Sequence, residues 1–315
     1  MMGRRRIVAL APLLASSGYD VIHVHTPFVA HYAGVALGRR LGLPVVESYH
    51  TFFEEYLHYY VPFLPRALMR LLARRMSVTQ CNAIDALVVP SARMLERLRS
   101  YGVTARAEVL PTGLDLSRFR GGDGPAFRAL HGIEPKRPLL QHISRVAHEK
   151  NIDFVLEALA LVRASVPDLL LVVGYLDRGT TLPDCHRAGD AFVFASRTET
   201  QGLVLLEALA LGVPVVSTAV MGTAQVLDGA RGAIVAPDEI TGFGAAVTRV
   251  LQNPRLRAEL AAAGPADAAS WSAAAMAERL TALYRELVGG TRRPRYSAVP
   301  PVVSTDPSCR PSGSE

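Results

Sequence analysis

The sequence has few features of an extracellular, disulfide-bonded or membrane-spanning protein. Its three cysteines, Cys81, Cys185 and Cys309, are far apart and odd in number, and they lack the spacing of a metal site or a disulfide framework. This usage is typical of a reducing cytoplasm. No run of about 18 uncharged apolar residues occurs, so we expect no transmembrane helix. The start MMGRRRIVALAPLLASSGYD resembles a secretory signal only in outline, because it continues directly into a buried-strand pattern.

Lysine is also scarce. Only Lys136 and Lys150 occur, so arginine carries nearly all of the positive charge. The formal net charge of +6 permits phosphates, lipid head groups or nucleic acid as partners without choosing among them. Because nothing resembles a base-reading helix or an aromatic stacking platform, we do not expect nucleic acid to bind. Half of the 315 residues are hydrophobic, which suffices for the cores of two ordinary domains.

Short apolar strands alternate with helices along the chain, which predicts parallel sheets covered on both faces. One series of strands runs from DVIHVHTPF to AEVLPTG and a second from LLQHISR to GAIVAP. A segment rich in Gly, Pro and charge separates them, and the last residues are rich in Pro and Ser, as disordered tails are. The predicted divisions are a first domain at 1–118, a linker at 119–138, a second domain at 139–290 and a tail at 291–315.

Two carboxylates flank the start of one helix in the segment SRTETQGLVLLEALALGVPVVST. The helix begins near Gly202 after a buried strand, so free amides around Gly202 and Leu203 lie at the carboxyl edge of the sheet and favour a phosphate. Glu199 lies in the turn before the helix, and Glu207 lies among apolar helical residues. A buried carboxylate needs donors, so Glu207 pairs with a cation or accepts hydrogen bonds from ligand hydroxyls. An ordinary strand–helix–strand crossover has the same pattern without a ligand.

The segment SRVAHEKN places positive charge at the same edge. Arg145 follows the strand LLQHIS and Lys150 begins the next helix, so together they could neutralise a diphosphate. A solvated loop of mixed charge is the alternative interpretation.

These segments resemble the donor-binding half of glycosyltransferase family 4. Glu199 and Glu207 match the family's E-x7-E pattern, and ISRVAHEKN is similar to its GRL-x-x-EKN segment, with Ser144 where glycine is usual. The resemblance implies an α/β protein of the GT-B fold, in which two Rossmann-like domains with parallel sheets face each other across a cleft. It makes 1–118 the acceptor-side domain and 139–290 the nucleotide-sugar-binding domain.

The resemblance also implies a role for each residue. Glu199 would contact the hydroxyls of the donor sugar, and Glu207 would hold the ribose of the nucleotide. Arg145 and Lys150 would bind the diphosphate, assisted by the amides at the helix start. Enzymes of this family retain the anomeric configuration and need no metal, so we expect a UDP-sugar as substrate and no cofactor.

The first domain supplies candidates for the acceptor side. His50 ends the strand PVVESY, and its YHT segment resembles the family's histidine near the reacting sugar, which suits positioning or proton handling. Glu54, His58 and Tyr59 follow as candidates for an acceptor pocket, although a helix N-cap built on Thr51 explains the acidic residues equally well.

Two histidines in HVHTPF, His23 and His25, lie on one face of the expected strand. They predict no metal site, because a third ligand is lacking.

An arginine-rich helix and an aromatic segment bear on the acceptor. Arg66, Arg70 and Arg74 recur every four residues, as in helices that lie on anionic membranes, although a solvated helix packed on its sheet fits as well. The segment HTFFEEYLHYYVPF resembles the family's bacterial diacylglycerol glucosyltransferases. We therefore expect a lipid acceptor such as diacylglycerol, with a saccharide as the alternative. The expected location is the cytoplasm, with peripheral contact at the inner face of the plasma membrane.

Two parts of the family pattern are missing from the sequence. Strands normally precede DVIHVH, and a helix and a strand normally separate DLLLVVG from AFVFAS, so both domains are expected to be incomplete. The main hypothesis is a retaining glycosyltransferase that moves a hexose such as glucose from a UDP-sugar. The alternatives are a catalytically silent chain with at most weak nucleotide binding and, more distantly, a membrane-bound scaffold.

Overall fold

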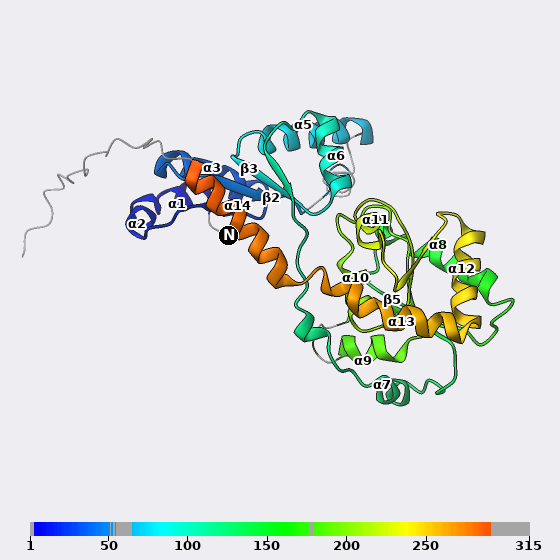
Figure 1. Ribbon diagram of the computed structural model, residues 1–315. Coiled ribbons are helices and arrows are strands. Elements are labelled where there is room, and N and C mark those ends of the chain that lie inside the picture. Colours follow the sequence, from blue (N-terminus) through cyan, green and yellow to red (C-terminus); the bar gives the residue numbers. More distant parts are fainter. Residues whose placement is uncertain are drawn as a thin grey trace, which may run out of the picture.

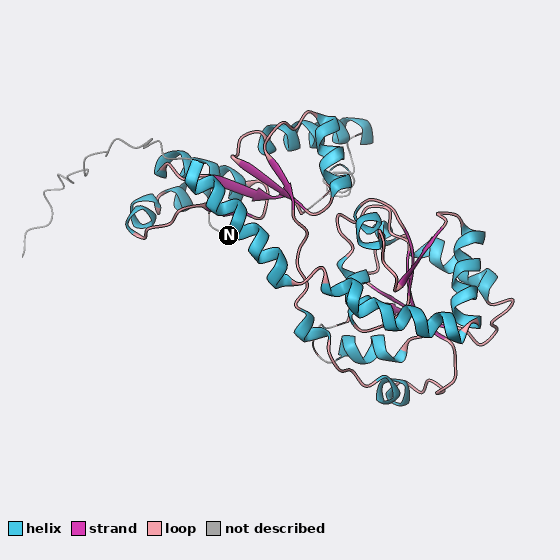
Figure 2. Cartoon of the chain, viewed as in Figure 1, coloured by secondary structure: helices cyan, strands magenta, loops and turns pink. Residues whose placement is uncertain are grey.

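The computed structural model describes residues 3–50, 52, 54, 65–176, 179 and 181–290. Two separate groups of strands, each surrounded by helices, make up the molecule (Figures 1 and 2). The first sheet has the order β1-β2-β3-β4 and the second the order β6-β5-β7-β8-β9, and all strand pairs are parallel. The predicted α/β class with two parallel sheets is confirmed.

The elements of the first lobe alternate as expected, with helices between successive strands. In order they are α1 (Arg4–Val8), α2 (Ala11–Ser16), β1 (Ile22–Val24), α3 (Val29–Leu41), β2 (Val45–Ser48), α5 (Arg66–Cys81), β3 (Ala86–Val89), α6 (Ala92–Tyr101) and β4 (Ala107–Val109).

The second lobe begins with two short helices and ends with a run of three helices. Its elements are η1 (Leu116–Phe119), α7 (Gly124–Leu130), β5 (Leu139–Ile143), η2 (His148–Lys150), α8 (Ile152–Val162), β6 (Leu170–Gly174), α9 (Thr181–Ala188), β7 (Ala191–Phe194), α10 (Leu203–Ala210), β8 (Val215–Thr218), α11 (Gly222–Leu227), β9 (Ala233–Ala236), α12 (Ile240–Gln252), α13 (Pro254–Ala269) and α14 (Ala273–Gly290).

Helix α3 illustrates how the sequence sets close packing in the first lobe. Gly34 and Gly38 face β1 and β2, and an added Cβ would lie 2.4 Å from Val24 and 2.2 Å from Val45. Glycine therefore permits the helix to approach the sheet. The helix ends at Gly42, which has a φ of 70° in the left-handed region that favours glycine.

The two faces of the first sheet are covered by different parts of the chain. Leu87 packs with Met94 of α6 on one face, whereas Val46 and Val88 pack with Leu283 of α14 on the other. Figure 1 shows α14 (orange) running from the second lobe back to the first. The end of the predicted second domain thus belongs physically to the first sheet, and the predicted linker contains α7, which packs against α9.

The second sheet is buried on both faces, as the continuous apolar strands predicted. Phe192 and Phe194 of β7 pack with Leu205 of α10, while Val193 faces Val155 of α8. Strand β6 lies at the edge of this sheet, and α9 alone connects it to β7 among the described residues. This arrangement agrees with the expected absence of one strand–helix unit at this place.

Candidate active site

The turn between β7 and α10, residues 198–202, is the centre of the site and is called the donor turn below. It carries Glu199, whose carboxylate forms an ion pair with Lys150 at the end of η2. Lys150 is held in place because the next residue, Asn151, adopts a φ of 55° and donates its side-chain amide to the Ala195 carbonyl at 3.0 Å. The two side chains are 12% and 18% exposed, so the pair lies largely out of water but within reach of a ligand.

Helix α10 begins directly after the donor turn. Gly202 is buried at its N-cap with a φ of 89°, a conformation that favours glycine and brings the helix amides to the carboxyl edge of the sheet. Helix α11 supports the turn from behind, because the Gly222 amide donates to the Glu199 carbonyl at 2.8 Å. The amides of Leu203 and its neighbours at this helix start can thus face a phosphate.

Glu207 is buried one turn further along α10, at 4% exposure. It lines a cavity of about 120 Å³ together with Arg145 and Lys150. Ser144 and the exposed Tyr175 complete its polar rim. The structure therefore brings three of the residues proposed for nucleotide binding into one hollow. Arg145 is free to reorient, because its side chain is 66% exposed and its ion pair with Glu149, at 3.2 Å, is partly open to solvent.

The buried His142, behind this hollow, adds no positive charge to that of Arg145 and Lys150. Burial and the charge of Lys150 together lower the pKa of His142 to about 4, against the opposing effect of a hydrogen bond to the Val193 carbonyl at 3.0 Å. His142 is therefore neutral at pH 7 and donates its Nδ1 hydrogen to that carbonyl. It stacks on Phe194, over which the Lys150 ammonium also lies, at 5.7 Å from the ring centroid.

His50 meets the donor turn from the other lobe. It lies just past the carboxyl end of β2, and its backbone carbonyl accepts a hydrogen bond from Thr200 Oγ1 at 3.3 Å. Its ring Nε2 lies 3.3 Å from His25 Nδ1. Partial burial and the neighbouring His25 lower the pKa of His50. With His23 and His25 it lines a second cavity, of about 430 Å³, that is closed by α14.

Glu54 does not line this cavity and instead binds side chains of two neighbouring helices. Its carboxylate is buried and binds Arg74 of α5 and Tyr101 of α6, with Arg97 3.7 Å away. Burial alone would raise the pKa of Glu54, but the hydrogen bonds from Arg74 and Tyr101 bring it below the usual value. The carboxylate thus ties α5 to α6. His58 and Tyr59 lie outside the described residues.

Comparison with known proteins decides the family. Residues 2–118 match Glycosyltransferase Family 4, and residues 170–253 match Glycosyl transferases group 1. D-inositol 3-phosphate glycosyltransferase 2 of Catenulispora acidiphila is 31% identical over an alignment 321 residues long. The alignment, gaps included, spans 86% of this chain and 74% of that protein. The chain belongs to glycosyltransferase family 4.

Other relatives of this family 4 glycosyltransferase differ in length and substrate. The alpha-monoglucosyldiacylglycerol synthase of Streptococcus pneumoniae is 30% identical over 230 residues, 63% of this chain and 51% of that protein. This chain spans about half the length of that relative and of the Arabidopsis thaliana sulfoquinovosyl transferase. Two solved structures share the fold. Sucrose-phosphate synthase of Thermosynechococcus elongatus has a TM-score of 0.71 and 19% identity over 92% of this chain and 81% of that chain. An Anabaena protein in complex with UDP-glucose has a TM-score of 0.72 and 15% identity over 89% of this chain and 82% of that chain.

Sequence reasoning missed the residues that join the two lobes of this family 4 chain. The Gln201 side chain accepts from the Thr112 amide at 2.7 Å and donates to the Thr112 carbonyl at 2.8 Å. Gln225 of α11 accepts from the Ala92 amide of α6 at 2.6 Å. A glutamine directly before the N-cap glycine of α10 was the signal available for Gln201, but its partner lies 89 positions away.

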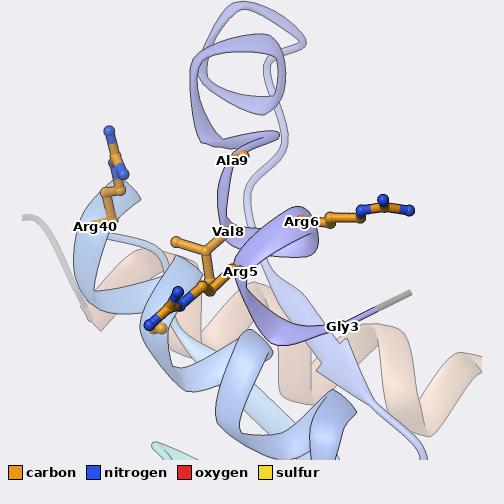
Figure 3. A pocket seen from close by; sticks show the side chains of 7 residues that line it. Gly3, Arg5, Arg6, Val8, Ala9 and Arg40 are labelled. Atoms are coloured by element: carbon orange, nitrogen blue, oxygen red, sulfur yellow. The ribbon is translucent and has the colours of Figure 1, made fainter. Parts of the chain in front are cut away.

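A larger hollow, of about 830 Å³, opens between α1 and α3 (Figure 3). Arg5, Arg6 and Arg40 line it, and none of the motif residues contributes to it. It therefore belongs to the outer surface of the first lobe and not to the candidate active site. Within the described part of the chain, no group of three or more His, Cys, Asp or Glu side chains could hold a metal ion.

Proposed function

We propose that this chain transfers a hexose such as glucose from a UDP-sugar to an acceptor hydroxyl, with retention of configuration and without a metal. The carrying observation is the hollow in which Arg145, Lys150 and Glu207 meet beside the donor turn. Two cations, free helix amides and a buried carboxylate together suit a diphosphate attached to a ribose. The Anabaena neighbour was solved with UDP-glucose, which supports the choice of donor.

The ion pair between Lys150 and Glu199 gives the proposed site its mode of action. A bound donor would separate the pair, with Lys150 turning to the diphosphate and Glu199 to the sugar hydroxyls. As the bond from the anomeric carbon to the diphosphate oxygen breaks, Lys150, Arg145 and the α10 amides stabilise the departing charge. The acceptor oxygen then bonds to the anomeric carbon from the same face, and its proton passes to the diphosphate.

For the acceptor we propose a glycerolipid such as diacylglycerol, reached by peripheral contact with the anionic inner face of the plasma membrane. The name of the Streptococcus pneumoniae relative supports a glycerolipid. Leu68, Leu71 and Leu72 of α5 are 41–46% exposed and lie on one side of that helix, next to the exposed Arg75. Exposed leucines beside arginine suit the interface of an anionic bilayer.

The proposed membrane contact rests on the leucines and Arg75 of α5, and not on Arg66 and Arg74. Arg74 is engaged by Glu54, and the side chain of Arg66 lies outside the described residues. No helix in the described ranges is long and apolar enough to cross a membrane.

The donor site is tested by calorimetry with UDP and UDP-glucose and by a turnover assay with diacylglycerol and with soluble saccharides. Lys150→Ala and Glu199→Ala should both lower turnover, and Lys150→Ala should also weaken UDP binding. Arg249→Ala, at the far helix α12, serves as the control. If neither site variant lowers turnover in an active preparation, the site assignment is wrong. Binding of UDP without turnover on any acceptor would favour the alternative of a catalytically silent chain.

The membrane contact is tested by sedimentation with vesicles of phosphatidylglycerol and phosphatidylcholine over a salt series. The double variant Leu71→Gln, Leu72→Gln should bind anionic vesicles less tightly than the unmodified chain. Leu130→Gln removes a leucine that is 80% exposed on α7 and should leave binding unchanged. Equal binding by both variants, or binding that salt does not weaken, would exclude the α5 surface as the contact.

A further inference from the structure

Three histidines form a row at the carboxyl edge of the first sheet. His23 lies in β1 and His25 directly follows that strand, while His50 lies just past the end of the neighbouring strand β2. The ring centroids of His23 and His25 lie 4.0 Å apart, and those of His25 and His50 lie 5.7 Å apart with the planes 10° from parallel. Both strands carry the row on the face that α14 covers. The middle ring, His25, therefore touches the outer ring, His50, on one side and a fixed ring on the other.

The inner end of the row is fixed through both of its nitrogens. His23 Nε2 lies 2.9 Å from Ser48 Oγ, and His23 Nδ1 is hydrogen-bonded to the hydroxyl of Tyr284 on α14. Burial, together with the neighbouring His25 and His50, lowers the pKa of His23 to about 4. Among the described residues no carboxylate forms an ion pair with any of the three rings. The lowered pKa values keep the rings of His23 and His50 neutral at pH 7, where each acts as a hydrogen-bond donor and acceptor.

In the contact between His25 and His50, one ring nitrogen must carry a hydrogen and the facing nitrogen must lack one. Because His25 Nδ1 and His50 Nε2 lie 3.3 Å apart, one donates and the other accepts when both rings are neutral. His25 is exposed, and a neutral imidazole in water ordinarily carries its hydrogen on Nε2. His25 Nδ1 is then the acceptor and His50 Nε2 the donor.

We propose that His25 is a positioning residue that holds His50 in its Nε2–H tautomer, so that His50 Nδ1 remains the ring atom that can accept a hydrogen bond from the acceptor hydroxyl. The role in turnover rests on the proposed function, whereas the tautomer does not. His23, held by Ser48 and Tyr284, is the wall against which His25 stacks. Since Tyr284 belongs to α14, the helix that returns from the second lobe completes this support for the first.

Two substitutions separate the hydrogen bond from the packing. His25→Phe keeps a ring on the stack but removes the acceptor, and His25→Asn keeps an acceptor oxygen near the position of Nδ1. Long-range proton–nitrogen correlation spectra of histidine-labelled protein at pH 7.5 report which nitrogen of His50 carries the hydrogen. We expect the Nε2–H form in the unmodified chain and in His25→Asn, and a mixture of tautomers in His25→Phe.

In the turnover assay His25→Phe should lower kcat about tenfold or more, because His50 no longer aligns the acceptor hydroxyl whose proton passes to the diphosphate, with the KM for UDP-glucose unchanged. His25→Asn should restore most of that loss. An equal loss in both variants would show a packing role and overturn the proposal, as would a His50 that keeps its tautomer in His25→Phe. If the unmodified chain shows no turnover, the proposed function fails, and the tautomer of His50 in the three proteins still decides the role of His25.

Discussion

The substitution Gly222→Ala tests whether the donor turn must hold its observed position. Gly222 is the first residue of α11 and is buried against the turn. An added Cβ would lie 2.2 Å from the carbonyl carbon and oxygen of Thr200 and 2.3 Å from the Gln201 amide nitrogen. These are backbone atoms, so no side-chain rotation can relieve the contact. To reach ordinary contact at 3.4 Å, the turn and α11 must separate by about 1 Å.

The stability cost follows from three contributions. Overpacking of a rigid site costs about 1–3 kcal/mol, and loss of the hydrogen bond from Gly222 to Glu199 costs about 1 kcal/mol more. Alanine gains up to about 1 kcal/mol over glycine inside a helix, which offsets part of this loss. The expected net destabilisation is about 1–3 kcal/mol, or on the order of 5 °C in Tm. Displacement of Glu199 and the α10 start should also weaken UDP binding about tenfold or more, since 1.4 kcal/mol is a factor of ten.

Gly232→Ala is the matched control. Its added Cβ would lie 2.5 Å from the backbone of Gly264, so it creates a similar clash in the same lobe, between β9 and α13 and away from the donor turn. Thermal unfolding should show a lowered Tm for both variants, and calorimetry should show weakened UDP binding for Gly222→Ala alone. Equal UDP affinities in the two variants would refute the reasoning, because the clash would then act only through general stability.

Three further outcomes are expected. Gln201→Leu removes both of its hydrogen bonds to Thr112 and should lower the free energy of unfolding by about 1–3 kcal/mol in urea titrations, whereas Gln252→Leu, an exposed helix-end control, should change it little; equal effects would contradict the bridging role. Glu54→Gln should lower Tm but leave the Kd for UDP unchanged, and a weakened UDP affinity would contradict its structural role. Burial lowers the pKa of His142 and His186 to about 4, so below pH 6.5 the unfolded chain binds more protons than the folded chain. The free energy of unfolding should therefore be highest above pH 6.5 and fall toward pH 4. An unchanged urea midpoint between pH 7.5 and pH 5 would contradict this.

The strands and most helices could be predicted because their signals are local. Runs of Val, Ile and Leu bounded by glycine specify buried parallel strands, and Gly42 and Gly102 end α3 and α6 in the left-handed conformation. The proximity of Lys150 and Glu199 was also accessible, since both follow strands whose carboxyl ends lie at one edge. The return of α14 to the first sheet was not, because an amphipathic helix does not specify which apolar surface it covers.

The surroundings of Glu54 show the same limit for side chains. Its position after His50 suggested an acceptor pocket, but its partners Arg74, Arg97 and Tyr101 come from two helices further along the chain. An acidic residue in a sequence pairs with whichever cation the fold brings to it. Only tertiary packing decides between a ligand-binding carboxylate and a structural one.

In the proposed function, the donor turn couples substrate binding to the contact between the lobes. Within five residues it contains Glu199, which pairs with Lys150; Thr200, which binds the His50 carbonyl; and Gln201, which binds Thr112 at the segment joining the lobes. A ligand that draws Glu199 away from Lys150 must therefore act on a backbone that is also hydrogen-bonded to the first lobe. Movement of the turn by about 1 Å would stretch those bonds beyond their normal range of about 3 Å. Donor binding and the relative position of the two lobes consequently cannot change independently at this site.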